Sequence, residues 1–181
     1  LFRSEEEVAF SPSLNNTDNT ISARTRPTRK MSKDLSLIKS KLILQRTVPS
    51  SFISPTGDTF TWLWLPLAEI KTILDVRNTE HVLKNMRNTS PVTEQMHLEF
   101  LGEYHSLQRI DFILQHQETG EYVGGINISL TCHGFEIGKY IGNTKYLGKG
   151  LAFQMTKNFI DYVKKNVKEI EKINAVTKLD N

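Results

Sequence analysis

Apolar residues recur at helical spacing in three parts of the chain. The clearest stripe lies in the range 151–166, where apolar side chains four positions apart share one face of a helix: Leu151, Met155, Phe159 and Val163. Weaker stripes predict helices over 67–86, interrupted at Arg77, and over 93–104, where Thr93 is the expected N-cap. The pattern therefore predicts one strongly amphipathic helix near the end of the sequence and further helices in its middle.

Alternation of apolar and polar residues predicts strands on either side of these helices. The ranges 109–117, 122–131 and 135–142 are separated by two short, glycine-containing turns, so we expect an antiparallel meander. Within the second of these strands, Gly124 and Gly125 indicate a bulge or a close approach of two backbones. Shorter strands are expected over 41–47, 60–65 and 173–177.

The order of these elements predicts the fold class. A strand, a helix and a second strand in succession usually form a parallel unit, so the strand over 173–177 should lie parallel to the strand over 135–142. The remaining strands should pair in antiparallel fashion. We therefore expect an α+β fold with a mixed, mostly antiparallel central sheet and helices on both faces.

Composition narrows the class of protein further. The 181 residues carry a net charge of +3 and a single cysteine, Cys132, so we expect one domain without an internal disulfide. A lone cysteine fits a reducing compartment, and we expect a cytoplasmic protein with no membrane span and no metal site. Residues 1–40 are rich in Ser, Thr and Asn, which predicts a disordered or extended tail before a domain over 41–181.

The segment before the last predicted helix carries the clearest chemical signal. It reads KYLGKGLA and begins at Lys145. Gly148 and Gly150 allow the positive φ values that turn successive N–H groups toward one point, and the helix that follows adds unpaired N–H groups and a partial positive charge. With the charges of Lys145 and Lys149, this segment suits a pyrophosphate. The dinucleotide fingerprint fails at Phe153, and no Walker sequence occurs.

The same segment resembles a known cofactor loop. The pattern [Q/R]-x-x-G-x-[G/A] is the acetyl-coenzyme A loop of the GCN5-related N-acetyltransferase (GNAT) superfamily, and Lys145 replaces its usual Gln or Arg. The longer run EIGKYIGNTKYLGKGLA resembles the branch that acetylates ribosomal-protein N-termini and nucleotide-linked amino sugars. The resemblance covers about Leu42 to Asn181. It implies that the strands over 135–142 and 173–177 splay apart at one end to admit the pantetheine arm.

The resemblance implies where acetyl-coenzyme A would lie. Pantetheine and the thioester would run beside the strand over 135–142, and a backbone N–H near Tyr140 would polarise the thioester carbonyl. The N–H groups of the glycine loop would hold the pyrophosphate, and Asn181 matches an asparagine that often binds the cofactor arm. The implied cofactor-binding residues are Gly138, Lys139, Tyr140, Lys145, Tyr146, Leu147, Gly148, Lys149, Gly150, Leu151 and Asn181.

The implied reaction is direct attack of a neutral primary amine on acetyl-coenzyme A, which requires a proton acceptor. Glu136 is the first candidate, because it shares one face of an alternating strand with Gly138 and Tyr140. The predicted catalytic residues are therefore Glu136 and Tyr140, although Glu136 could instead pair with a nearby basic residue. His133 is the second candidate for the base, and Cys132 lacks the partner pattern of a nucleophile.

The segment over 67–106 would shape the acceptor pocket. Four of its polar or basic residues would suit an anionic acceptor, although solvated loop positions explain them equally well: Arg77, Asn78, Arg87 and Asn88. We favour a small amine-bearing metabolite, such as a nucleotide-linked amino sugar. Three alternatives stay open: a protein N-terminal acetyltransferase, a non-catalytic acetyl-coenzyme A-binding scaffold, and a nucleic-acid-binding protein using the basic run over 24–33, which lacks interleaved aromatic residues.

The resemblance also implies elements beyond the end of this sequence. In the family, a helix and one or two strands follow, together with a tyrosine that protonates the leaving thiolate. The sequence ends at Asn181, so we expect a domain that lacks its C-terminal elements and whose activity is in question. A missing strand would expose a sheet edge, and self-association into a homodimer is therefore compatible with the pattern.

Overall fold

The structure is a computed structural model that describes residues 35–41, 48–166 and 172–176. Its centre is one six-stranded sheet in which each strand lies beside the next one along the chain. The strands are β1 (Phe52–Ile53), β2 (Thr59–Trp64), β3 (Arg109–His116), β4 (Tyr122–Thr131), β5 (Gly134–Ile141) and β6 (Ile173–Ala175). β5 and β6 are parallel, and the other neighbouring pairs are antiparallel. The predicted α+β fold with its mixed sheet is confirmed.

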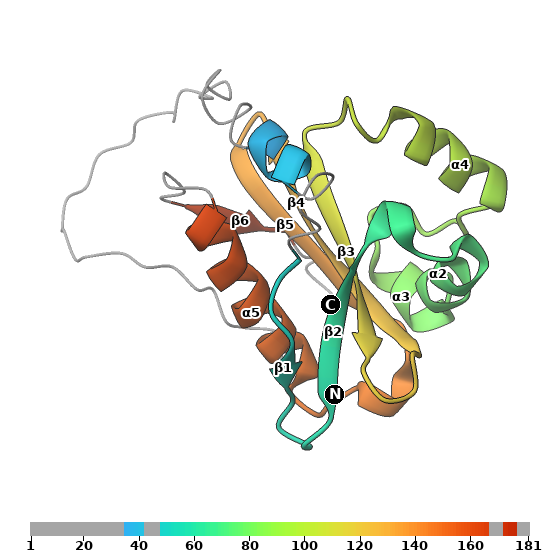
Figure 1. Cartoon of the computed structure of the whole chain (residues 1–181). Helices are drawn as coiled ribbons and strands as arrows, with labels where there is room; N and C mark the ends of the chain where they lie inside the picture. The colour runs from blue at the N-terminus through green and yellow to red at the C-terminus, as the bar shows by residue number, and fades with distance from the viewer. Residues whose placement is uncertain (1–34, 42–47, 167–171, 177–181) are drawn as a thin grey trace, which may run out of the picture.

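Helices lie on both sides of the sheet (Figure 1), with α5 on one side and α2 to α4 on the other. The α-helices are α2 (Ile70–Arg77), α3 (Glu80–Asn85), α4 (Glu94–Glu103) and α5 (Leu151–Asn166), and the 3₁₀ helices are η1 (Leu65–Leu67) and η2 (Thr144–Tyr146). The predicted interruption at Arg77 is confirmed, because α2 ends there. Thr93 caps α4 as expected, since its hydroxyl accepts the N–H of Met96 at 3.2 Å.

The stripe that predicted α5 is the face that this helix buries. Leu151, Met155, Phe159 and Val163 are each no more than 2% exposed. The Phe159 ring lies 5.9 Å from Phe112 of β3 and 6.2 Å from Trp62 of β2, centroid to centroid. Aromatic packing of this kind joins the helix to the middle of the sheet and fixes the position of the helix N-terminus.

β3 is buried on both of its faces. Its alternating pattern therefore does not separate a buried face from a solvent-exposed face. Phe112 and Leu114 are fully buried on one face, and Asp111 and Ile113 are almost as buried on the other. Two layers of helix cover the central strands, and this explains why a carboxylate at Asp111 lies in the interior.

The two adjacent glycines of β4 permit the close backbone approach that the sequence indicated. A Cβ atom at Gly124 would lie 2.2 Å from the carbonyl oxygen of Tyr140, and a Cβ at Gly125 would lie 2.8 Å from the Tyr140 ring. The pairing of β3 with β4 also shifts register beside Gly124, where Leu114 faces Gly124 but Gln115 faces Tyr122. β5 therefore lies against β4 with the Tyr140 ring across Gly125.

The structure differs from the expectation for the end of the N-terminal tail. Residues 35–41 form a helix, and its Leu35 and Ile38 side chains are each 1% exposed. The ammonium group of Lys39 donates hydrogen bonds to the carbonyls of Tyr104 and Leu107 and lies 4.4 Å from the centre of the Tyr104 ring. Residues 35–41 are therefore packed against the rest of the structure. A single turn with two apolar residues is too short to stand out as a stripe in the sequence.

Several expectations fall outside the described residues or differ in detail. Residues 1–34 and the predicted strand over 42–47 are outside the described ranges, and Lys41 belongs to the short helix. β1 lies at Phe52–Ile53, between the strands predicted over 41–47 and 60–65, and it pairs with β2. The Cys132 thiol is exposed. In the described part of the chain, no helix combines the length and apolarity needed to cross a membrane.

Candidate functional site: a glycine loop and a neighbouring cavity

The glycine loop lies between the end of β5 and the start of α5. Gly148 has a φ of 72° and Gly150 a φ of 71°, both in the left-handed region that glycine adopts without strain. The carbonyl of Gly150 accepts the N–H of Gln154 at 3.2 Å, so α5 begins directly after the second glycine. The first N–H groups of a helix have no acceptor within the helix, and the loop therefore presents N–H groups that can receive an anion.

The loop is held in place by a buried tyrosine. Tyr146 is 2% exposed, and its ring centre lies 5.4 Å from that of Phe60 and 6.2 Å from that of His116. The Asn143 side chain accepts the N–H of Lys145 at 3.0 Å and donates to the Glu121 carboxylate at 2.7 Å. These contacts fix the chain between β5 and the glycines.

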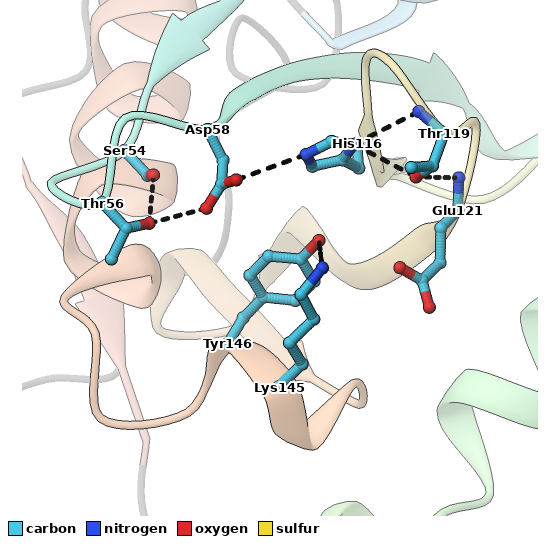
Figure 2. A network of polar contacts seen from close by, with 8 residues as sticks. All are labelled: Ser54, Thr56, Asp58, His116, Thr119, Glu121, Lys145 and Tyr146. Atoms are coloured by element: carbon cyan, nitrogen blue, oxygen red, sulfur yellow. Dashed lines mark hydrogen bonds and ion pairs between the residues drawn. The ribbon is translucent and has the colours of Figure 1, made fainter.

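His116, whose ring packs against that of Tyr146, belongs to a network of polar contacts (Figure 2). His116 Nε2 lies 3.5 Å from the Asp58 carboxylate, and His116 Nδ1 accepts the backbone N–H of Thr119 at 3.3 Å. Because Nδ1 accepts a hydrogen bond, Nε2 carries the proton of the neutral ring and points it at Asp58. The hydroxyl of Thr56 donates to Asp58 at 2.7 Å, and this hydrogen bond lowers the pKa of Asp58.

Two lysines place positive charge at the loop. Lys145 and Lys149 are both exposed. The Lys145 ammonium group lies 3.4 Å from the Tyr146 hydroxyl and 5.1 Å from the centre of its ring. The hydrogen bond to Tyr146 raises the pKa of Lys145, so this side chain is charged at neutral pH. A cation beside free N–H groups favours an anionic ligand.

β5 is paired with β6 at its first half. Phe135, Glu136 and Ile137 face β6 residues, whereas no β6 partner among the described residues faces Gly138 or the residues after it. The second half of β5 therefore has an edge that described strands leave open. Gly138 leaves room for the side chain of Asn127 in β4, because a Cβ at this position would be 2.7 Å from the Asn127 side-chain oxygen.

A cavity of about 380 Å³ lies between this part of the sheet and the helices α2 and α4. Tyr140 and Gly138 of β5 border it, so the cavity and the second half of β5 adjoin. Its polar wall comes from five sequence segments and contains Arg77, His97, Arg109, Asp111, Asn127, Lys139 and Tyr140. We call it the inner cavity below.

Solved structures of known proteins share this architecture. The GNAT domain of S. lividans PAT matches with 12% sequence identity and a TM-score of 0.58, over 74% of this chain and 80% of that chain. Spermidine N-acetyltransferase from Vibrio cholerae, in complex with CoA and spermine, matches at 14% identity and a TM-score of 0.57, over 67% and 73%. AAC(6')-Ib in complex with ribostamycin and coenzyme A matches at 14% sequence identity with a TM-score of 0.57, over 67% of this chain and 75% of that chain. The chain has the GNAT acetyltransferase fold.

Identities this low establish the shared fold and leave the activity of this chain to be argued from its own residues. No protein-family model matches the sequence, and no curated protein is significantly similar to it. The sequence resemblance to the GNAT superfamily is thus confirmed at the level of fold, including the parallel strand pair next to the glycine loop.

Within the GNAT fold, Glu136 is engaged in an ion pair. Its carboxylate lies 2.6 Å from the guanidinium of Arg87, whose side chain is 70% exposed, and Glu136 is not among the residues that line the inner cavity. Burial raises the pKa of Tyr140 above its usual range, so its hydroxyl stays protonated. The other candidate base, His133, is exposed in the turn before β5.

The remaining predicted residues have varied places. Arg77 borders the inner cavity, as expected for an acceptor pocket. Asn78 instead holds the loop before α4, since its side chain donates to the Val92 carbonyl and accepts the Val92 N–H. Asn88 accepts the N–H of Ser90 within its own loop. Asn181 lies outside the described residues.

Sequence reasoning missed most of the polar wall of the inner cavity. The sequence analysis singled out none of His97, Asp111 and Asn127. A signal was present, because Asp111 and Asn127 each lie between apolar neighbours within a strand. No group of three or more His, Cys, Asp and Glu side chains suited to a metal ion occurs within residues 35–41, 48–166 and 172–176.

Proposed function

We propose that this protein is an acetyl-coenzyme A-dependent N-acetyltransferase that acts on the primary amine of a small metabolite. The observation that carries the proposal is the pair of left-handed glycines, Gly148 and Gly150, directly before the N-terminus of α5. This geometry presents N–H groups and positive charge where a pyrophosphate would bind. The residues from Tyr146 to Leu151 would hold it, with Lys145 beside them.

The rest of the cofactor would follow β5. Pantetheine would pair with the open edge of β5 from Gly138 to Tyr140, as an added strand does, and would bring the thioester to the border of the inner cavity. The backbone N–H near Tyr140 would stabilise the oxyanion that develops when the amine attacks. Asn181 and Lys139 complete the proposed binding set. Coenzyme A in the spermidine and AAC(6')-Ib structures supports this class of cofactor.

Glu136 is our proposed proton acceptor, acting directly or through a water molecule. The amine must lose a proton to attack, and Glu136 precedes Gly138 and Tyr140 on the same strand face. The ion pair with Arg87 places a cation beside this carboxylate, and the exposed Arg87 side chain would have to move for Glu136 to reach a proton of the amine. A variant Glu136→Gln should lower kcat in an assay of thiol release, because an amide cannot accept the proton of the amine.

Calorimetric titration with acetyl-coenzyme A tests the proposal. The wild-type chain should bind, and Gly148→Glu should weaken binding about 100-fold, which corresponds to about 2.7 kcal/mol, because it puts a carboxylate at the phosphate position. Gly134→Glu is the matched control: Gly134 also has a left-handed φ, 98°, but it lies at the opposite end of β5. A folded wild-type chain that does not bind acetyl-coenzyme A would overturn the proposal.

The ion pair of Glu136 with Arg87 favours one second candidate, a non-catalytic acetyl-coenzyme A-binding protein of the same fold. In that case the cofactor would bind and the loop variant would still abolish binding. Release of free thiol in the presence of amines would separate the two candidates, because only a transferase converts acetyl-coenzyme A to coenzyme A in an amine-dependent way.

The homodimer and cytoplasmic location stay predictions of the sequence.

A further inference from the structure

The inner cavity has an excess of positive charge on its wall. Among the described residues that line it, the one carboxylate is that of Asp111, which is 6% exposed and accepts two hydrogen bonds from the guanidinium of Arg109. This pair is neutral as a unit and satisfied. Burial lowers the pKa of His97, so its ring is uncharged at neutral pH. Arg77 and Lys139 are then left as cations that no carboxylate of the described residues neutralises.

Arg77 is the cation that most clearly lacks a partner. Its Nη1 atom is buried and makes no hydrogen bond with any described residue. Its guanidinium lies 5.8 Å from the centre of the Tyr140 ring, a contact that compensates only part of the lost hydration. A guanidinium remains charged at any physiological pH. A buried, charged donor without an acceptor is costly, so this position is built for a partner that comes from outside the described chain.

The place of Arg77 connects this missing partner to the reaction. Tyr140, which the guanidinium faces, is the residue whose backbone N–H would polarise the thioester. An anion bound to Arg77 would therefore lie within a few bonds of the amine that attacks. A polyamine, such as the spermine bound in the Vibrio cholerae enzyme, would bring further positive charge to a wall that is already positive.

We propose that the acceptor is a small amine that also carries a carboxylate or phosphate group, and that Arg77 binds this acid group. The proposal rests on the proposed acetyltransferase function and names its substrate class. Arg77 is then a specificity-determining residue. It contributes through two N–H groups and a full charge, and it distinguishes acidic amines from neutral amines and polyamines.

Two matched pairs of amines test this specificity, with release of free thiol from acetyl-coenzyme A as the readout. The pairs are propylamine with β-alanine, and glucosamine with glucosamine 6-phosphate, and spermidine is the polycationic comparison. In at least one pair the acid-bearing member should have a kcat/KM at least about tenfold higher, the effect of one charge-assisted hydrogen bond. The carboxylate pair and the phosphate pair distinguish the two kinds of acid group.

Variants then assign the preference to Arg77. Arg77→Gln should remove it by lowering kcat/KM for the acidic amine alone, and Arg77→Lys should retain part of it, because the charge stays while the planar fork is lost. Lys71→Gln is the matched control, since it removes one positive charge from the exposed surface of the same helix. Thermal melting of each variant checks that the fold is intact.

A binding measurement keeps the test independent of turnover. Calorimetric titration of the chain with glucosamine 6-phosphate and with β-alanine should show binding that Arg77→Gln weakens at least about tenfold. Such binding without any binding of acetyl-coenzyme A would support the acid site and overturn the acetyltransferase proposal. The acid-site proposal is wrong if the neutral amines or spermidine are preferred, if Arg77→Gln lowers every amine equally, or if neither acidic probe binds the wild-type chain.

Discussion

The glycine loop and the inner cavity lie at the same end of β5 but are assembled in different ways. The loop and the turns around it come largely from one continuous stretch, Asn143 to Leu151, and a single buried ring, Tyr146, holds it to the sheet. The cavity takes its wall from α2, α4, β3, β4 and β5, which are up to about 70 residues apart along the chain. A motif of the first kind is readable from sequence, whereas a site of the second kind appears only when the chain has folded.

The largest expected effect concerns Gly142, which lies between the end of β5 and the glycine loop and packs against α2, one of the helices that border the inner cavity. A Cβ at Gly142 would lie 2.0 Å from the carbonyl oxygen of Val76 in α2, and neither backbone can move freely. We expect Gly142→Ala to lower the free energy of unfolding by more than about 3 kcal/mol, measured by urea denaturation.

The matched control for that variant is Gly102→Ala in α4. A Cβ at Gly102 would meet nothing within 4 Å, and alanine suits a helix interior better than glycine. The free energy of unfolding should rise by about 0.5–1 kcal/mol. If Gly142→Ala were as stable as the wild-type chain, the two regions would not be joined at this contact as the structure has it.

The second prediction compares Tyr104, which supports Asp111 of the cavity wall, with Tyr146 of the loop. The Tyr104 hydroxyl accepts the N–H of buried Asp111 at 2.8 Å, whereas the Tyr146 hydroxyl has Lys145 beside it at 3.4 Å. Tyr104→Phe leaves a buried donor unpaired and should cost about 1–3 kcal/mol of unfolding free energy, and Tyr146→Phe should cost less than about 0.5 kcal/mol. Equal losses in chemical denaturation would contradict the difference that we infer between a hydroxyl paired with a buried backbone N–H and a hydroxyl paired with an exposed lysine.

The smallest expected effect is on the network behind the loop. The Thr56 hydrogen bond holds the pKa of Asp58 below the value of an unfolded chain. A lowered carboxyl pKa contributes stability above the unfolded pKa of about 3.9, and that contribution is lost as the pH falls through the folded pKa. Thr56→Val should raise the pKa of Asp58 toward its unfolded value, and it should lower stability slightly at pH 7 but not at a pH below the folded pKa. An NMR titration of the Asp58 carboxyl that shows an unchanged pKa would exclude this role for Thr56.

Local patterns predicted most of the sheet and the loop. The alternation over 109–142 fixed three strands, and two glycines next to a four-residue apolar repeat identified the loop before α5. The helix over 35–41 was missed because Leu35 and Ile38 give only one turn of apolar spacing, and its burial depends on Tyr104, far away in sequence.

The chemistry of the site was harder to predict, because it depends on contacts between residues that are far apart in the sequence. Glu136 looks free in the sequence, but its partner Arg87 is 49 residues away and reaches it only when α3 and its following loop fold over β5. Arg77 and His97 become wall residues because α2 and α4 pack on the sheet face that Asp111 shares. Hydrophobic periodicity predicts which face of a helix or strand a residue occupies. It does not predict which residues of other elements that face will contact.

The central claim is that coenzyme A binds at the glycine loop and along the second half of β5 while the acceptor binds at Arg77, and an NMR titration of the ¹⁵N-labelled chain tests it most directly. Coenzyme A should shift the amide signals of Tyr140, Gly148, Gly150 and Leu151 and leave that of Gly134 unchanged. Glucosamine 6-phosphate or β-alanine should then shift signals around Arg77 without moving those of the glycine loop. Coenzyme A shifts that are absent from the loop, or that spread equally over both regions, would contradict the account.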